Sequence, residues 1–361
     1  MSYNSYRRKT VSFKVGNIGI GDSYPISVQS MTNTPTSDVD ATYGQIMRLC
    51  EAGCDIVRLA IPDTESVKTI SELKNRGVKI PLVADIHFDY RLALLSIEAG
   101  IDKIRINPGN IGERKNVEAV VKAAAQREIP IRIGVNSGSV EKHILEKYGA
   151  PTAEALAESA LYHTSILESC GFDKIAVSVK ASSVPEMIKA NRILAERTSY
   201  PLHLGVTEAG ARERALIKSS IGIGTLLSEG IGDTVRVSLT DDPTKEIYAA
   251  REILSTLLLT EKRGLDIVSC PTCARTKINL ISLSEQFEKK ASETGIDKLK
   301  LKVALMGCAV NGPGEAREAD IGIAGGNGEA LLFKRGEIIR KIKEENVIDE
   351  LIDEIKLMAK E

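Results

Sequence analysis

The sequence predicts an α/β protein in which a (β/α)8 TIM barrel is followed by a small α/β (α+β) domain. Eight short apolar runs, rich in β-branched residues, recur along residues 25–240, and segments with the apolar spacing of helices lie between them. Eight such units fit the roughly 250 residues that this barrel typically takes. An open doubly wound sheet is the alternative, but the first strand–helix turn carries no G-x-G-x-x-G fingerprint.

Composition limits the classes of protein to which the chain can belong. Its 361 residues, 43% of them hydrophobic, suffice for one large and one small globular domain. A formal net charge of −1 provides no broad basic surface for nucleic acid or membranes. The polar stretch Met1–Thr10 lacks the apolar core of a signal peptide, and no apolar run is long enough for a membrane span. Six unevenly spaced cysteines do not make a disulfide framework, so we expect a cytoplasmic protein.

The expected elements follow one another in a regular order. A hairpin over Val11–Ile20, turning at Gly16-Asn17, precedes the repeats. Several helices pass to the next strand through a glycine, as at Ala52-Gly53 and Ala99-Gly100. The expected strands are Pro25–Met31, Ile56–Pro62, Pro81–His87, Lys103–Pro108, Ile131–Ser137, Lys174–Ser182, Leu202–Glu208 and Thr234–Thr240, and helical spacing is clear in Tyr43–Ala52, Arg91–Ala99, Val117–Gln126 and Pro185–Arg197.

The pattern changes beyond Gly264, and this change sets the domain boundary. Asp242–Leu259 reads as the eighth helix, because the Asp-Pro pair at its start favours a helix opening. We therefore assign residues 1–260 to the barrel, as the substrate-binding domain, and residues 265–361 to the second domain. The second domain is expected to hold strands at Asp266–Ser269, Lys300–Met306 and Asp320–Ala324 and helices at Ile278–Ala291 and Glu337–Glu345.

Three of the six cysteines lie in the second domain, in a pattern that indicates a metal centre. Cys270 and Cys273 form a C-x-x-C pair, and Cys308 opens a stretch that ends in a tight turn before Glu315. Zinc prefers four Cys or His ligands, and no fourth Cys or His is available in this part of the sequence. Three thiolates suit a [4Fe-4S] cluster whose remaining iron takes a weaker ligand, for which Glu315 is the candidate. The alternative is two structural cysteines and one unrelated one.

Positive side chains stand between aliphatic neighbours in four of the expected strands, at Arg58, Arg105, Arg132 and Arg236. Parallel strands are normally apolar on both faces, so this pattern is unusual. Because side chains alternate along a strand, other polar residues share the same face or lie near strand ends, where barrel enzymes build their sites. These further residues are Asp85, His87, Asn107, Asn136, Lys180, Glu208 and Ser238.

The charges at this end of the barrel do not balance. The four arginines and Lys180 are opposed only by Asp85 and Glu208. Unpaired, partly buried ions cost several kcal/mol each. A polyanionic ligand would remove this cost, and the planar fork of arginine suits phosphate oxygens. The alternative is that the arginines pair with carboxylates from loops that the sequence does not place.

Five stretches together carry a resemblance to one family. The chain resembles, over essentially its whole length, the 4-hydroxy-3-methylbut-2-enyl diphosphate synthases of the non-mevalonate isoprenoid pathway, in their shorter bacterial form. The stretches that carry this resemblance are Ser27–Thr34, Ala84–Phe88, Arg105–Asn110, Gly205–Gly210 and Cys308–Glu315.

The resemblance implies a reaction, a cofactor and a partner. It implies reductive opening of 2-C-methyl-D-erythritol 2,4-cyclodiphosphate, with electrons from ferredoxin or flavodoxin. It also implies a [4Fe-4S] cluster held by Cys270, Cys273, Cys308 and Glu315. We hypothesise that Glu208 transfers a proton and that the cationic side chains bind the diphosphate. Asp85, His87, Asn107, Asn136 and Asn311 would then orient the substrate, with Asp85 and His87 close to the chemistry.

Two other functions stay open at this point. One is a barrel enzyme that binds a pterin or sugar phosphate and has a purely structural cluster. The other is an iron–sulfur redox sensor, which explains the thiols but not the cations.

A head-to-tail homodimer is expected from the length of the domain link. The eighth helix should return the chain to the face of the barrel opposite the site. The link Thr260–Leu265 spans at most about 20 Å. A closed two-fold pair lets each second domain serve the partner's barrel.

Overall fold

The computed structural model describes residues 6–107, 109–260, 264–309 and 316–360. The chain forms two compact units, Met1–Thr260 and Glu261–Glu361. Each unit has its own sheet and its own hydrophobic core.

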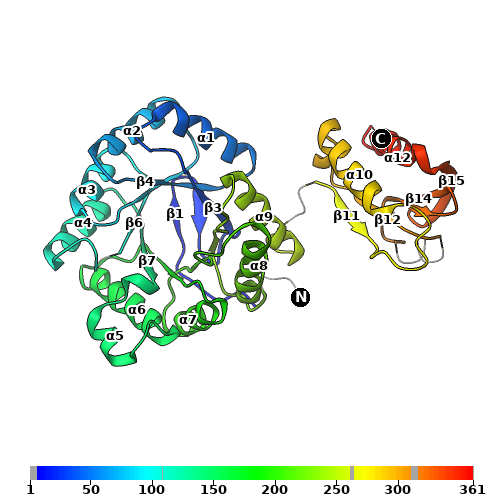
Figure 1. Ribbon diagram of the computed structural model, residues 1–361. Coiled ribbons are helices and arrows are strands. Elements are labelled where there is room, and N and C mark those ends of the chain that lie inside the picture. The colour runs from blue at the N-terminus through cyan, green and yellow to red at the C-terminus, as the bar shows by residue number, and fades with distance from the viewer. Residues whose placement is uncertain (1–5, 108, 261–263, 310–315, 361) are drawn as a thin grey trace. The chain divides into compact units, whose positions relative to one another are not determined.

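The first unit is the TIM barrel that the sequence predicts. Eight strands are parallel in the order β8-β7-β6-β5-β4-β3-β10-β9, and a parallel bridge between Val177 and Leu202 joins the two ends of the sheet. Helices surround the strands as an outer ring (Figure 1). The barrel strands are β3 Ser27–Met31, β4 Ile56–Ala60, β5 Leu82–Asp85, β6 Lys103–Ile106, β7 Ile131–Asn136, β8 Ile175–Lys180, β9 His203–Leu204 and β10 Thr234–Val235. The helices are α1 Val39–Glu51, α2 Thr64–Asn75, α3 Tyr90–Glu98, α4 Arg114–Gln126, α5 Lys142–Tyr148, α6 Ala153–Ser169, α7 Val184–Arg197, α8 Arg212–Ser228 and α9 Pro243–Thr256.

The last two barrel strands are much shorter than the sequence indicates. Apolar runs led us to expect strands over Leu202–Glu208 and Thr234–Thr240, but β9 and β10 each contain two residues. Glu208, Arg236 and Ser238 therefore lie on the segments that follow these strands. The apolar residue Val206 is still fully buried, because the segment after β9 continues along the barrel wall.

Most of the barrel helices are capped at their N-termini by a short polar side chain. These N-termini lie at the end of the barrel where the strands finish. The carboxylates of Asp38, Asp63, Asp89 and Asp242 each accept a backbone N–H in the first turn of the following helix. Such a cap stabilises a helix by about 1 kcal/mol. The caps also fix where each strand–helix loop ends, and so they shape the mouth of the barrel.

An N-terminal hairpin contributes to the floor of the barrel. Strands β1 (Phe13–Val15) and β2 (Ile18–Ile20) pair antiparallel, as the sequence predicts. Phe13, Val15 and Ile20 form one buried cluster with three inward-facing residues of the barrel strands, namely Ile56, Val83 and Ala176. Where the hairpin packs, the end of the barrel at which the strands begin is therefore apolar.

The second unit is a five-stranded sheet with two helices packed on it. Its strands follow the order β11-β12-β13-β14-β15, the first three parallel and the last two antiparallel. Helices α10 and α12 share a buried cluster with strand residues such as Val303, Ile323 and Leu332. The elements are β11 Asp266–Ser269, α10 Leu280–Thr294, β12 Lys302–Met306, β13 Ile321–Gly325, β14 Glu329–Lys334, β15 Glu337–Lys343 and α12 Val347–Met358.

The expected helix at Glu337–Glu345 is wrong. Glu337–Lys343 form β15, an edge strand that pairs with β14 through the two-residue turn Arg335-Gly336, and Glu344 and Glu345 begin a short 3-10 helix. Both turn residues have positive φ, 49° and 82°, which is the geometry of hairpin turns that match strand twist. The apolar residues of this segment suggested a helix, but its partner strand decides the conformation. The helix lies further on, at α12, and also lines the core.

Candidate functional site

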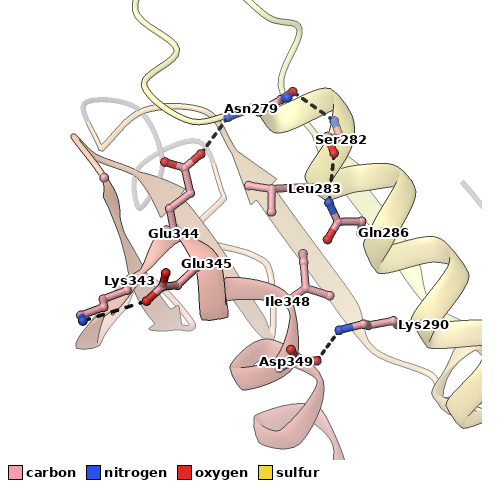
Figure 2. A pocket seen from close by; sticks show the side chains of 11 residues that line it. Asn279, Ser282, Leu283, Gln286, Lys290, Lys343, Glu344, Glu345, Ile348 and Asp349 are labelled. Atoms are coloured by element: carbon pink, nitrogen blue, oxygen red, sulfur yellow. Dashed lines mark hydrogen bonds and ion pairs between the residues drawn. The ribbon is translucent and has the colours of Figure 1, made fainter.

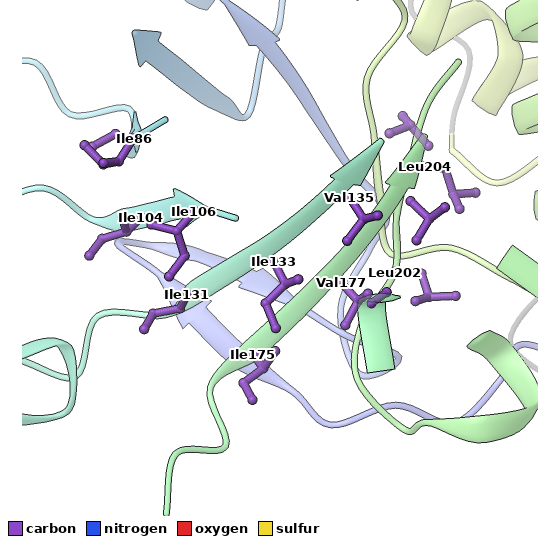
Figure 3. Close-up of a cluster of buried hydrophobic side chains, with 14 of the residues drawn as sticks. Ile86, Ile104, Ile106, Ile131, Ile133, Val135, Ile175, Val177, Leu202 and Leu204 are labelled. Carbon is purple, nitrogen blue, oxygen red and sulfur yellow. The ribbon is translucent and has the colours of Figure 1, made fainter. Parts of the chain in front are cut away.

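Strand alternation separates an apolar outer wall from a charged barrel interior. On β6 and β7, Ile104, Ile106, Ile131 and Ile133 belong to the large buried cluster between strands and helices (Figure 3). The residues between them, Arg105 and Arg132, are neighbours in the pairing of the two strands and point to the opposite face, inside the barrel. The unusual pattern in the sequence is thus an inward-facing set of cations.

Asp85 is the carboxylate in the middle of this set. It is 5% exposed, and its oxygens lie 3.0 Å from Arg105 Nη1 and 3.5 Å from Arg58 Nε. Burial acts to raise the pKa of Asp85, but Arg58, Arg105 and Arg132 outweigh it and hold the pKa below its usual value. Burial in turn lowers the pKa of Arg58 to about 10, although Asp85 opposes that change. Asp85 is therefore an ionised partner for two arginines.

A second acid, Glu246, enters the site from the first turn of α9. Its Oε1 accepts from Arg236 Nη2 at 2.9 Å and from the Leu239 amide, and its Oε2 accepts from Ser30. Arg236 also donates to the Ser238 hydroxyl at 2.6 Å. Sequence reasoning missed Glu246, although its place just inside the helix that follows the eighth strand puts it at the mouth. One of the arginines thus has the carboxylate partner that the alternative interpretation proposed.

Arg132 and Lys180 make no ion pair with any described residue. Arg132 is 1% exposed, and its Nε and one terminal nitrogen have no hydrogen-bond partner in the described part of the chain. Burial, followed by repulsion from Arg58 and Arg105, holds the pKa of Arg132 well below its usual value. Burial and repulsion from Arg236 do the same for Lys180. With Asp85 and Glu246 as the two acids among five cations, the charge of the barrel interior is not balanced by the described residues.

Two glycines make room for these long side chains. A Cβ at Gly134 would lie 2.5 Å from Arg105 Nε, and one at Gly205 would lie 3.0 Å from Lys180 Nζ. A larger residue at Gly134 would displace the Arg105 guanidinium, and one at Gly205 would also meet the Arg236 carbonyl oxygen at 2.6 Å. The glycines at positions 134, on β7, and 205, after β9, therefore leave the space that the cationic side chains occupy.

The polar residues expected at the mouth differ in exposure. Asn107 is 2% exposed, and its Nδ2 has no partner among the described residues. His87, Asn136 and Glu208 are exposed. Glu208 has φ of 52°, a backbone conformation that non-glycine residues adopt at a cost and that clusters at functional sites. No hydrogen bond or ion pair joins Glu208 to the described part of the chain, so its carboxylate is available.

Two further buried bases lie inside the barrel, and the sequence analysis assigned neither of them. Lys103 and His203 are 0% and 1% exposed, and their side-chain nitrogens lack partners among the described residues. Burial lowers the pKa of Lys103 to about 7, with Arg132 adding to the shift. Burial and then Arg132, Lys180 and Lys103 hold the pKa of His203 well below its usual value. Lys103 precedes Arg105 by two residues, so strand alternation alone would have placed it inside.

In the second unit, hydrogen bonds connect the two loops that carry the cysteines. The Cys270 sulfur accepts from the Gly307 amide at 3.2 Å, and the Lys277 amide donates to the Gly307 carbonyl at 2.8 Å. Gly307 is the residue before Cys308. A Cβ at Gly307 would lie 2.8 Å from the Thr276 methyl, so the close approach of the loops requires glycine. Loops far apart in sequence thus bring Cys270, Cys273 and Cys308 into one region.

The thiol chemistry of this region fits an iron–sulfur centre. Hydrogen bonds from Arg275, followed by Thr276, lower the pKa of the exposed Cys273 thiol, which favours the thiolate that binds metal. Within the described residues, no three His, Cys, Asp or Glu side chains are already arranged as a metal site. Asn311 and Glu315, two of the expected site residues, lie outside the described residues. The three expected ligands that are described, all cysteines on adjoining loops, fit an iron–sulfur cluster.

Described residues of the second unit line two surface clefts. One, of about 540 Å³, lies between α10 and the start of α12 and is crossed by ion pairs and hydrogen bonds such as Lys290–Asp349 and Asn279–Glu344 (Figure 2). The other, of about 340 Å³, is lined by Cys270, Thr272 and the exposed Ile281. The second cleft places Cys270 at the protein surface, whereas the first contains none of the expected site residues.

Two cysteines of the barrel, Cys50 and Cys54, are unsuited to metal binding. Burial raises the pKa of Cys54 to about 12, and its thiol donates to the Ile56 carbonyl. Burial also raises the pKa of Cys50. None of the described helices has the length and apolar character needed to cross a membrane.

Comparisons with known proteins point to one family. The model of the GcpE TIM-barrel domain matches residues 10–251, and that of the GcpE protein C-terminal domain matches residues 266–357. A relative from Ruminiclostridium cellulolyticum is 60% identical over 98% of each chain. One from Clostridium perfringens is 58% identical over 96% of this chain and 98% of its own. Both relatives are named 4-hydroxy-3-methylbut-2-en-1-yl diphosphate synthase (flavodoxin).

Solved structures support the fold alone. A type I 3-dehydroquinate dehydratase from Clostridium difficile has a TM-score of 0.51 at 15% identity, covering 69% of this chain and 97% of its own. The two family models and the close relatives confirm the resemblance seen in the sequence, and they show that this chain belongs to the GcpE family.

Proposed function

We propose that this chain is an oxidoreductase that opens the ring of 2-C-methyl-D-erythritol 2,4-cyclodiphosphate to give 4-hydroxy-3-methylbut-2-enyl diphosphate. The reaction takes up two electrons and two protons and releases one water. The observation that carries the proposal is the barrel interior, where five cations face only two carboxylates among the described residues. A cyclic diphosphate supplies the missing negative charge, and the product named for the relatives is a diphosphate.

The cations differ in the role that their contacts support. Arg58, Arg105 and Arg236 are held by carboxylates, so they are oriented before the substrate arrives. Arg132 and Lys180 have no such partner among the described residues and gain most from phosphate oxygens. As the C–O bond to the diphosphate breaks, charge develops on the leaving oxygen, and fixed cations stabilise it without reorganising. Ser238, Asn107, Asn136 and Asn311 are proposed to orient the rest of the substrate.

Proton transfer is assigned to groups on the loops of the mouth. Asp85 is kept ionised by its arginines, so it orients them and the substrate and holds no proton to give. Glu208 and His87 are exposed and follow β9 and β5. We propose that Glu208 donates a proton to the departing hydroxyl group, because a carboxylic acid within reach of that oxygen allows it to leave as water.

Cys270, Cys273, Cys308 and Glu315 would hold a [4Fe-4S] cluster. When bound, it supplies electrons one at a time and a Lewis-acidic iron. The relatives' names make flavodoxin the proposed donor, with ferredoxin as the alternative. A cluster of this kind needs reduced thiols, in keeping with a cytoplasmic location. We assign residues 265–361 to cluster binding and residues 1–260 to the substrate.

We also propose a homodimer in which the second unit of each chain serves the partner's barrel. The short link Thr260–Leu265 supports this arrangement, although residues 261–263 lie outside the described residues. Exposed apolar side chains on the barrel add support: Ile217 and Ile221 share a face of α8 and are 59% and 52% exposed, and Tyr248 on α9 is 62% exposed.

Complementation tests the dimer. Glu208→Gln and Cys273→Ser chains are mixed under conditions that exchange subunits. Activity should recover to about a quarter of wild type, because half the dimers are mixed and each mixed dimer has one intact composite site. Subunit exchange without recovery would contradict the arrangement.

The reaction itself is tested on anaerobically purified protein with a chemical reductant and the cyclic diphosphate, following the linear product by phosphorus NMR. Product formation that requires iron supports the proposal. Turnover that persists after iron removal would favour a barrel enzyme with a structural cluster. Binding without turnover in the iron-loaded protein would favour a sensor.

A further inference from the structure

A buried carboxylate and a buried histidine are in direct contact beside the mouth of the barrel. Glu141 precedes α5, after the short turn that follows β7, and His163 lies on α6 with its side chain 1% exposed. The Glu141 Oε1 and His163 Nε2 atoms face each other. Burial acts to raise the pKa of Glu141, but His163 and Ser159 outweigh it and hold the pKa below its usual value. The sequence analysis assigned no role to either residue.

The Glu141–His163 pair lies next to the backbone at Gly109. A Cβ built on Gly109 would lie 3.1 Å from Glu141 Oε1 and 3.2 Å from His163 Cε1. Contacts this short are tighter than most Cβ atoms make, so a side chain at this position would force the pair or the loop after β6 to shift by a few tenths of an ångström. The pair therefore forms the surface on which that loop rests.

Gly109 in turn holds the side chain of Asn107. The Gly109 amide donates to Asn107 Oδ1 at 3.1 Å, and the Asn110 amide donates to the Asn107 carbonyl at 2.9 Å. With its Oδ1 engaged in this way, the Asn107 carboxamide has one orientation, and its Nδ2 is left without a partner among the described residues. A buried donor without a partner is costly unless a ligand satisfies it. Asn107 follows Arg105 by two residues and so faces the same side as this arginine.

We propose that Glu141 and His163 are positioning residues for substrate binding: together they hold Gly109, and through it the Asn107 carboxamide, with Nδ2 directed at an oxygen of the bound cyclic diphosphate. The inference rests on the proposed function, in which Asn107 contacts the substrate. Among the described residues, no hydrogen bond or ion pair joins Glu141 or His163 to the five cations. Its effect is on the affinity of the site, not on the chemistry of ring opening.

A double-mutant cycle on the full-length, iron-loaded protein tests the proposal. The variants are His163→Leu, Asn107→Ala and the two combined, with the cyclic diphosphate as the titrant in anaerobic calorimetry. We expect each single change to raise Kd about tenfold, within the range found for coupled neighbours, and the double change to be no worse than Asn107→Ala. In His163→Leu, KM should rise with Kd, while kcat and iron content stay close to those of wild type.

Controls separate positioning from general destabilisation. His143→Leu makes the same change at an exposed histidine of α5 and should leave Kd unchanged. Glu141→Gln keeps the shape of the pair and removes its charge, so it should weaken binding even if His163→Leu folds poorly. Gly109→Ala should raise Kd as much as His163→Leu does, because its Cβ meets Glu141.

The outcomes distinguish two kinds of failure. If His163→Leu and Asn107→Ala both weaken binding and their effects multiply in the double variant, the pair does not act through Asn107 and the inference is overturned. If Asn107→Ala binds as well as wild type, the substrate role of Asn107 is wrong and the inference falls with it. If His163→Leu and Glu141→Gln both bind normally, the pair has only a structural role.

Discussion

Arg236 Nη2 donates to Glu246 Oε1 across 2.9 Å, joining the segment after β10 to the first turn of α9. The side chain of Glu246 is 4% exposed and that of Arg236 is 19% exposed. This contact gives one mouth arginine a fixed partner, whereas Arg132 has none among the described residues. The difference leads to opposite expectations for mutations at Glu246 and at Arg132.

Removing the Glu246 charge should destabilise the protein. Glu246→Gln leaves Arg236 buried among other cations, and loss of one partner of a buried pair costs about 3 kcal/mol. The free energy of unfolding in urea, without ligand, measures this loss. Inorganic diphosphate should restore part of it, because an anion takes over the role of the carboxylate. Glu229→Gln, the same change at an exposed pair with Arg192, should cost less than about 1 kcal/mol. Equal losses in the two variants would contradict this account.

Removing the Arg132 charge should have the reverse effect on stability. Arg132→Met eliminates a buried cation without an ion-pair partner among the described residues, so the free protein should unfold at a higher temperature. The cyclic diphosphate should bind more weakly by about 1.5–3 kcal/mol, the range for a bond to a charged group. Thermal unfolding and calorimetry on one sample give both quantities. Arg192→Met, on the outer surface, serves as the control. Unchanged affinity would remove Arg132 from the phosphate site.

Glu208→Gln should separate binding from turnover. The amide keeps the shape of the side chain at its strained position, where φ is 52°, but cannot donate the carboxyl proton. We expect Kd close to that of wild type and kcat lower by about 100-fold, the lower end of what a positioned acid contributes. Glu213→Gln, at the start of α8, is the matched control. Wild-type kcat in Glu208→Gln would exclude this residue from the proton transfer.

The cysteine loops should carry iron. Protein purified without oxygen should be brown and contain about four irons per chain. Cys273→Ser should lose both iron and turnover, and Glu315→Ala should retain iron but lose it faster on exposure to air. Cys170→Ser, in the barrel, should keep full iron content. Stoichiometric zinc in place of iron in the wild-type protein would refute the cluster assignment.

Lys103 should make stability depend on pH above neutrality. Its pKa is about 7 in the folded protein and 10.5 as its ordinary value, so the unfolded chain binds the extra proton between these limits. Stability then rises with pH across this window, because the unfolded state holds more protons there. Lys103→Met should be more stable than wild type near pH 7, with a gain that shrinks toward pH 10. Denaturant unfolding at several pH values tests this. A gain that is constant with pH would show that burial leaves Lys103 charged.

The repeating strand–helix pattern and the arginines at alternating strand positions were sufficient to predict the barrel and its cationic interior. Both depend on local periodicity, which each short segment carries by itself. The C-x-x-C pair and Cys308 likewise indicated a metal centre from residue types and spacing. The helix predicted at Glu337–Glu345 failed because an edge strand is decided by its partner, β14, and not by its own apolar residues.

Only the tertiary structure decided which charges meet. Glu246 reaches Arg236, and Glu141 reaches His163 and Gly109, because the barrel brings strand ends, loops and helix starts from distant parts of the chain to one mouth. Such contacts leave no periodic signal in the sequence. Burial is also a property of the closed barrel. It acts to raise the pKa of Asp85, which the arginines lower, and it lowers the pKa of Lys103. The sequence thus determined which residue types face inward, and the closure of the sheet determined their partners and their protonation.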